Sequence, residues 1–221
     1  NQLALNATGS PCWWQMGENY FFDSQSQANL EPTNIKYRID NAFHMLRHFE
    51  GMDEQLQANL LRAGHVEKNI QAELTLPGSR FFANFASDIP GLLNRICLYP
   101  SVILETGDRN IQLNGQVSSA DFPNGIGTKA VLHVDELSAS QRAAIFLRKN
   151  RGLDLLHLQV DKVPPTWEFT LVLRPTQQGH VFITAFPGPP ALPLPQHRLG
   201  RKRQEECKAF WDKHVFLVEA G

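Results

Sequence analysis

Hydrophobic positions recur every three to four residues through most of the first hundred residues. In residues 35–49 the apolar side chains Ile35, Ile39, Phe43, Leu46 and Phe49 have the spacing of one helix face. The same spacing follows twice more, and glycines close the first two segments, as is typical of helix ends. We therefore predict helices over residues 35–49, 52–64 and 66–74 and, with an interruption at Pro90, between Phe81 and Ile96.

After residue 100 the hydrophobic period changes to two, which indicates strands. Turn-forming residues separate the alternating segments, and residues 176–179 (TQQG) join the last two into an antiparallel hairpin. The strands are predicted over residues 101–106, 110–117, 129–134, 155–160, 167–175 and 180–187.

Two further helices are predicted among these strands. Residues 137–150 begin with Ser138 and Gln141, which have the spacing of a capping box. Residues 204–216 place Cys207, Phe210, Trp211 and His214 on one stripe. Between the last strand and this helix, residues 187–195 (PGPPALPLP) are expected to form an extended strap packed on the sheet.

These elements predict an α+β fold, with a helical N-terminal half followed by a small antiparallel sheet with flanking helices. Residues 1–100 form the helical region, and residues 101–221 form the candidate catalytic domain. The two regions can also form one unit.

Composition and charge narrow the function classes. No apolar run is long enough to cross a membrane, and no secretory signal is visible at the N-terminus. The first residue is not Met, so the chain is expected to be cut from a longer protein or processed. The three cysteines lie far apart, which argues against a disulfide framework or a zinc site.

Charge is distributed unevenly along the chain. Residues 1–120 hold 8 Lys and Arg against 12 Asp and Glu, a net charge of −4, whereas residues 121–221 hold 13 against 10, a net charge of +3. A locally basic surface permits a polyanionic ligand.

Alternation along the predicted strands gathers polar side chains on shared faces. If these faces line one cleft, the cleft holds Lys129, His133, Glu168, Thr170, Arg174, His180 and Thr184. Additional cations follow in Arg148, Lys149 and Arg151, which are candidates for phosphate binding. Each residue alone is an ordinary surface residue, and only their grouping favours a site.

That grouping fits metal-free cleavage of RNA by the substrate's own 2′-hydroxyl. The reaction needs a base, an acid and a cation beside the phosphorane. His133 or Glu168 is the candidate base, and His180 or His133 the candidate acid. Arg174 is the candidate phosphate-neutralising cation, while Thr170 and Thr184 donate hydrogen bonds. No cofactor or metal is expected.

The hairpin residues "TWEFTLVLRP" and "HVFITAFPGPP" resemble the C-terminal hairpin of the barnase/EndoU/colicin E5-D/RelE-like (BECR) ribonuclease superfamily. The resemblance covers residues 129–190. It implies an endoribonuclease in which Thr184 supplies the hydroxyl of the last strand and Arg174 supplies the cation of the adjacent strand. His133 would be the histidine of the active face. It also implies a bacterial polymorphic toxin domain that cleaves RNA, with tRNA as one candidate substrate.

The resemblance further implies a cognate immunity protein as inhibitor. The chain would then be a secreted or delivered effector that acts in a target-cell cytoplasm, and otherwise a cytoplasmic protein. Two alternatives remain open: an ADP-ribosyltransferase-type toxin that uses NAD, and a non-catalytic binding or scaffold domain.

Overall fold

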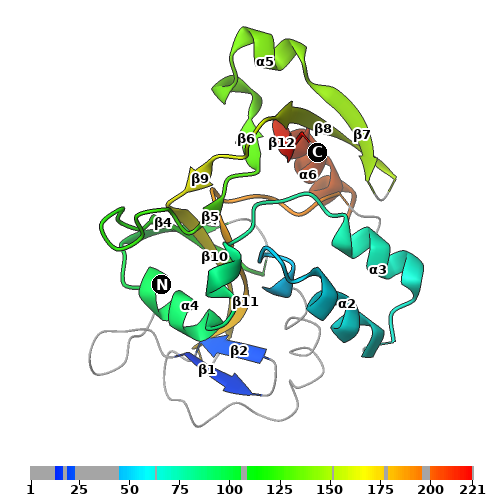
Figure 1. Ribbon diagram of the computed structural model, residues 1–221. Coiled ribbons are helices and arrows are strands. Elements are labelled where there is room, and N and C mark those ends of the chain that lie inside the picture. The colour runs from blue at the N-terminus through cyan, green and yellow to red at the C-terminus, as the bar shows by residue number, and fades with distance from the viewer. Residues whose placement is uncertain are drawn as a thin grey trace.

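The computed structural model describes residues 13–16, 19–22, 45–62, 64–105, 109–150, 152–176, 179–195 and 200–220. In this part of the chain, strands dominate over a few, mostly short helices (Figure 1). The helices are α2 (Asp53–Arg62), α3 (Glu67–Leu74), α4 (Ile89–Ile96), α5 (Ala139–Ala143) and α6 (Arg201–Trp211), with the 3₁₀ turns η2 (Ala83–Phe85) and η3 (Val134–Glu136).

Two four-stranded sheets organise the fold. The antiparallel sheet has the order β11 (Gly179–Pro187), β10 (Glu168–Thr176), β4 (Ile111–Gln116) and β3 (Ser101–Glu105). The mixed sheet has the order β6 (Val131–His133), β12 (His214–Glu219), β8 (Leu153–Val160) and β7 (Phe146–Asn150).

Two small antiparallel pairs complete the set of strands. They are β1 (Trp13–Met16) with β2 (Asn19–Phe22), and β5 (Gly127–Thr128) with β9 (Pro165–Thr166). β5 also passes close to the chain at Arg80: a Cβ on Gly127 would lie 2.3 Å from the Arg80 carbonyl oxygen. Only glycine permits this approach.

The main core lies between one face of the antiparallel sheet and α4. Phe169, Leu171 and Leu173 alternate along β10, and each is at most 1% exposed. They pack in one cluster with Leu93 and Ile96 of α4. α4 is amphipathic and begins with a cap in which the Asp88 side chain accepts a hydrogen bond from the Gly91 amide.

The mixed sheet is buried on both faces, by different parts of the chain. Val215 and Leu217 of β12 face a small cluster that includes Leu137. Phe216 points to the other face, where its ring stacks on Trp211 of α6 at 4.8 Å. Figure 1 shows α5 and α6 beside this sheet, at the top of the view.

The proline-rich strap, which the sequence predicted to pack on a single sheet, contacts both four-stranded sheets. Near its start, the Gly188 carbonyl accepts a hydrogen bond from Thr170 of the antiparallel sheet. Further along, the carbonyls of Leu192 and Pro193 accept from the indole of Trp211, beside the mixed sheet. A segment without regular structure therefore fixes one sheet against the other.

The predicted fold class, a helical N-terminal half followed by a small antiparallel sheet, is wrong. The described chain is mixed α/β with several sheets, and β12 pairs with β8 in parallel. Residues 35–44 of the first predicted helix lie outside the described residues.

Two predicted helices are also too long, because strand pairing replaces their second halves. The helix predicted over residues 137–150 ends at Ala143, although its Ser138–Gln141 capping box is present. The remainder forms β7, which pairs with β8. The helix predicted over residues 204–216 ends at Trp211, and β12 follows. Tertiary pairing overrides local periodicity in both segments.

Candidate functional site

The antiparallel sheet carries four of the predicted site residues on the face opposite its core. Thr170 pairs with Asn114 of β4, and Thr184 pairs with Val172 of β10. Glu168 and Arg174 alternate with the core residues of β10 and so share this face with Thr170. Their co-facial placement agrees with the sequence-based expectation.

This face is covered rather than open. Thr170 is 0% exposed and Thr184 is 6% exposed. The Thr170 hydroxyl donates to the Gly188 carbonyl at 2.8 Å, and the Thr184 hydroxyl lies 3.9 Å from the Met45 sulfur. The strap and the segment around Met45 therefore close the face that the predicted cleft required.

The charged residues of this face also have structural partners. The side-chain amide of Asn114 donates to Glu168 Oε1 at 3.1 Å. Arg174 Nε donates to Asn110 Oδ1 at 3.0 Å. These contacts hold both side chains along the sheet.

A β-bulge in β11 changes the predicted alternation. Val172 pairs with Thr184, but the next residue, Leu173, pairs with Phe182, so Ile183 is the extra residue. Phe182 consequently joins the main core, on the opposite face from Thr184. His180 pairs with Pro175 along the backbone, and its side chain is outside the described part of the chain.

His133 lies in the other sheet, on the edge strand β6. The structure therefore separates it from Thr184 and Arg174 but brings it close to Lys129. Glu136 connects the two: one carboxylate oxygen accepts from the His133 amide at 3.0 Å, and the other forms an ion pair with Lys129 Nζ at 3.0 Å. A compact charged cluster results at this edge.

A second histidine completes the cluster. β6 and β12 place His133 directly opposite His214, and their ring centroids lie 5.1 Å apart in an edge-on arrangement. The His214 ring also stacks on Phe210 of α6 at 3.7 Å. His214 is half-buried, and the His133 side chain is 34% exposed.

The two imidazole rings are anchored in opposite senses. His133 Nδ1 accepts a hydrogen bond from the Asp135 amide at 3.2 Å, so in the neutral ring Nε2 carries the proton. His214 Nδ1 lies 2.7 Å from the Phe210 carbonyl oxygen, which only accepts. Nδ1 of His214 therefore carries the proton, and its Nε2 presents a lone pair. We name these two residues the histidine pair.

Local electrostatics support different roles for the two rings. Burial lowers the pKa of His214, and the nearby charge of His133 lowers it further. His214 is therefore neutral at pH 7. His133 Nδ1 lies 3.4 Å from the Asp135 carboxylate, within ion-pair distance when the ring is protonated. Burial raises the pKa of Glu136, but hydrogen bonds from His133 and Lys129 outweigh it and lower the pKa overall.

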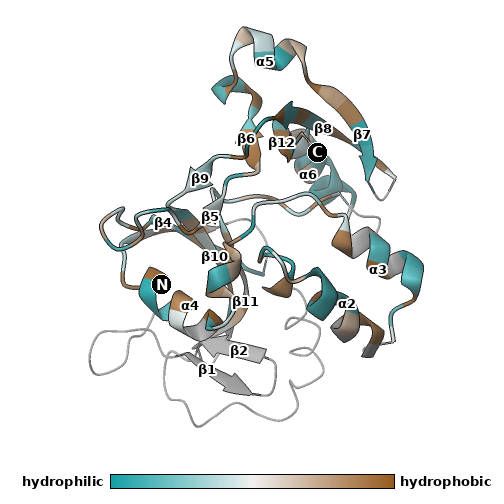
Figure 2. Ribbon diagram, in the orientation of Figure 1, coloured by the Kyte–Doolittle hydropathy of each residue, from teal (hydrophilic) through white to brown (hydrophobic). Residues whose placement is uncertain are grey.

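The predicted phosphate-binding residues Arg148 and Lys149 lie on β7, the opposite edge of the mixed sheet, and both are exposed. Figure 2 shows this strand changing from apolar at its start to hydrophilic at its end. Arg151 lies outside the described residues.

Among the described residues, no group of three His, Cys, Asp or Glu side chains is arranged to hold a metal ion. None of the described helices is both long and apolar enough to span a bilayer. No family model, curated protein or solved structure matches the chain. The resemblance to the BECR superfamily therefore stays a prediction.

Sequence reasoning identified His133 and Lys129 but missed His214, which it assigned to a helix stripe. A period-two signal was available: Val215 and Leu217 alternate with His214, Phe216 and Val218. Since the strand follows a helix after two residues, this short alternation was read as the end of that helix.

Proposed function

We propose that the chain cleaves RNA phosphodiester bonds through the histidine pair, without a metal ion. The observation that carries the proposal is the opposite anchoring of two facing imidazoles, one with a basic Nε2 and one with a proton-bearing Nε2. General acid–base catalysis requires two such groups side by side.

In the proposed reaction, His214 Nε2 takes the proton of the ribose 2′-hydroxyl, and the 2′-oxygen attacks the adjacent phosphorus. The bond between phosphorus and the 5′-oxygen breaks, and protonated His133 gives its Nε2 proton to that leaving oxygen. In the protonated ring Nδ1 is a donor, so it pairs with the Asp135 carboxylate 3.4 Å away in place of accepting from the Asp135 amide. The products are a 2′,3′-cyclic phosphate and a free 5′-hydroxyl. Proton exchange with water returns both rings to their starting states.

Lys129 supplies positive charge beside the pair. Its side chain is 23% exposed, and its ammonium group is held by Glu136, which also binds the backbone of His133. Glu136 therefore fixes the Lys129 ammonium group relative to His133 without occupying a nitrogen of either imidazole ring. A fixed cation stabilises the charge that develops on phosphate oxygens in the transition state.

The test is cleavage of total RNA and tRNA in EDTA by the full chain and by His133→Asn and His214→Asn. Asparagine keeps a group that can occupy the position of Nδ1, so the anchoring bonds to Asp135 and Phe210 are retained while Nε2 is lost. We expect each variant to lose about 10²- to 10⁴-fold in rate. The matched control is His65→Asn, because His65 is exposed and lies between α2 and α3.

The products provide a second readout. We expect 2′,3′-cyclic phosphate ends and no cleavage of DNA of the same sequence, because the nucleophile is the 2′-hydroxyl. Intact RNA with folded wild-type protein, or equal rates for wild type and both asparagine variants, would overturn the proposal.

A further inference from the structure

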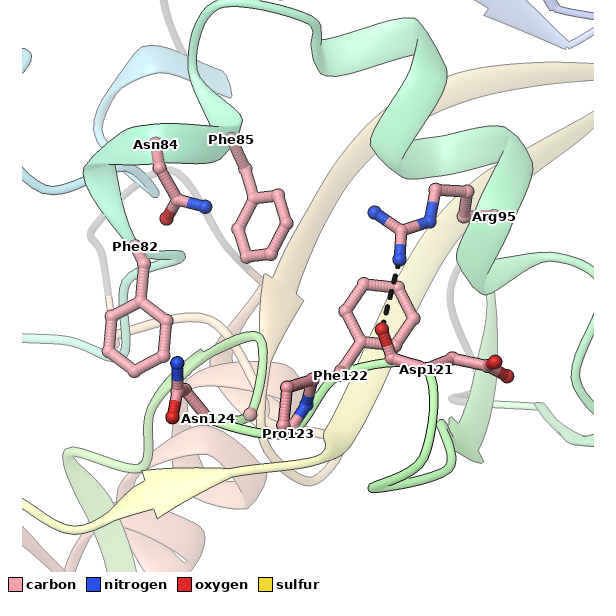
Figure 3. A pocket seen from close by; sticks show the side chains of 9 residues that line it. Phe82, Asn84, Phe85, Arg95, Asp121, Phe122, Pro123 and Asn124 are labelled. Carbon is pink, nitrogen blue, oxygen red and sulfur yellow. Dashed lines mark hydrogen bonds between the residues drawn. The ribbon is translucent and has the colours of Figure 1, made fainter.

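A second candidate site lies away from the histidine pair, at the end of the main core. It is a cavity of about 440 Å³ between η2, the C-terminal part of α4 and the loop after β4 (Figure 3). This volume is within the range of small-molecule sites. Its lining includes Phe82, Asn84, Phe85, Arg95, Phe122 and Asn124.

Arg95 places a positive charge on the cavity wall. Its guanidinium carbon lies 4.1 Å from the centroid of the Phe122 ring, and Nη2 donates to the Asp121 carbonyl oxygen at 3.1 Å. An aromatic face and a carbonyl orient the group but leave its full charge in place. In the described chain, no carboxylate forms an ion pair with Arg95.

The carboxylate of Asp121 is directed elsewhere. It accepts hydrogen bonds from the hydroxyl groups of Tyr99 and Ser118. Figure 3 shows it pointing away from Arg95, while the backbone carbonyl of the same residue points toward the guanidinium. The cavity is therefore suited to an anion at Arg95.

The rest of the lining is aromatic and amide. Phe122 is 3% exposed, and its ring centroid lies 6.0 Å from that of the half-buried Phe85. Phe82 faces the cavity from the other side in Figure 3, with the amides of Asn84 and Asn124 near it. Phenyl faces stack with flat rings, and an amide offers both donors and an acceptor to a heterocycle edge.

The loop that carries Phe122 is held in place before any ligand binds. The Phe122 carbonyl accepts from the indole of Trp167 at 2.7 Å, and the Phe122 amide donates to Ser118 at 3.0 Å. Gly125 has φ +83, and a Cβ there would lie 2.8 Å from the Thr166 carbonyl oxygen. The amide of Phe82, the residue before η2, donates to the Ile126 carbonyl at 3.1 Å. A preformed site loses little entropy on binding.

We propose that this cavity binds a nucleoside monophosphate, with the base stacked on the partly exposed rings of Phe82 and Phe85 and the phosphate bound by Arg95. The amides of Asn84 and Asn124 hydrogen-bond the edge of the base. The proposal is independent of RNA cleavage, since no residue of the cavity belongs to the histidine pair. A guanidinium, flat apolar walls and neutral amides together match a nucleotide better than they match a simple anion.

The experiment is isothermal titration of the full chain with AMP, GMP, CMP and UMP, and then with the corresponding nucleosides and with inorganic phosphate. We expect at least one nucleotide to bind, at least tenfold more tightly than its nucleoside and than phosphate alone. Arg95→Gln should weaken nucleotide binding at least tenfold. Arg142→Gln, an exposed arginine of α5, is the matched control and should change nothing.

Two further variants keep the outcome decisive. Asn84→Ala and Asn124→Ala remove exposed amides, so both proteins should fold, and they should change the ranking of the four nucleotides. Binding should persist in His133→Asn, even if RNA is never cleaved. Absence of binding by all four nucleotides at millimolar concentration, phosphate binding as tight as nucleotide binding, or full affinity in Arg95→Gln would overturn the proposal.

Discussion

The two sheets of this protein use polar side chains in opposite ways. In the antiparallel sheet, Thr170, Thr184 and Gln112 are buried beneath the strap and the segment around Met45. In the mixed sheet, His133 and His214 are only partly buried and lie at an edge. Both threonine candidates of the antiparallel sheet are therefore inaccessible to a substrate, whereas both histidines of the mixed sheet are partly accessible.

The difference arises from what covers each sheet. Backbone carbonyls of the strap accept hydrogen bonds from the polar face of the antiparallel sheet: Gly188 accepts from Thr170, and Ala191 accepts from Gln112 at 3.0 Å. Backbone groups also hold the histidines, but they occupy only Nδ1 of each ring. The polar atoms of the antiparallel sheet are used in folding, whereas Nε2 of each histidine makes no hydrogen bond to another described residue.

The largest expected effect concerns His48, which lies against the antiparallel sheet with its ring centroid 5.7 Å from that of Phe186. Burial, with smaller contributions from Arg47 and Arg80, lowers the pKa of His48 from 6.5 to about 3. Between these values the unfolded chain binds a proton that the folded chain does not. Stability from this residue is thus complete above pH 6.5 and falls by roughly 1.4 kcal/mol per pH unit below it.

We expect the free energy of unfolding to fall by about 2 kcal/mol between pH 7 and pH 5 on account of His48. Urea unfolding at the two pH values measures the difference. His48→Gln should remove most of it, whatever its effect on absolute stability, and exposed His65→Gln should not. A smaller dependence of stability on pH, of the same sign, should remain in His48→Gln, because burial also lowers the pKa values of His157 and His214. An unchanged slope in His48→Gln would contradict the prediction.

The next effect compares two threonines of the antiparallel sheet. Thr170→Val removes a hydroxyl that donates to Gly188 at 2.8 Å and lies 3.3 Å from the Asn114 amide. Leaving these buried groups unpaired should cost about 2 kcal/mol of stability. Thr184→Val loses only a 3.9 Å contact with a sulfur, and should cost less than about 1 kcal/mol.

Urea denaturation at pH 7 distinguishes the two valine variants. His133→Asn provides the reference from the mixed sheet, and we expect it to stay within about 0.5 kcal/mol of wild type because its ring is at an exposed edge. Equal losses of stability in all three variants would mean that polar side chains contribute equally to the stability of the two sheets.

The smallest effect concerns charge, and it rests on the proposed RNA cleavage. Replacing both Arg148 and Lys149 by Gln on exposed β7 should weaken RNA binding a few-fold at low salt and make binding less salt-dependent. Arg174→Gln should leave binding within about twofold, because Arg174 is bonded to Asn110. Filter binding at two salt concentrations tests both, and a larger loss in Arg174→Gln would reverse the comparison.

The strands of the antiparallel sheet could be predicted from the sequence, because their alternation is regular and two of their three pairings join strands that are adjacent in the chain, the exception being β4 with β10. β10 and β11 form the expected hairpin, and β3 and β4 pair next to each other. The mixed sheet could not be predicted in the same way. β12 pairs with β8 and β6, which lie tens of residues earlier, and no local pattern reports such partners.

The candidate site shows the same limit at the level of single residues. Alternation correctly placed Glu168, Thr170 and Arg174 on one face, but it gives no information on what covers that face. The bulge at Ile183 shifted Phe182 to the core, and one extra residue is enough to do so because the strand period is two. His214 became recognisable only once β12 was opposite β6.

The position of β12 between β6 and β8 has a consequence for folding during synthesis. β6, β7 and β8 leave the ribosome well before β12. Until β12 emerges, neither β6 nor β8 can pair with it, although β12 lies between them in the finished sheet. The antiparallel sheet and α4 are complete once β11 has emerged. We therefore expect folding in two steps, in which the histidine pair forms only in the second, after the ribosome has released β12.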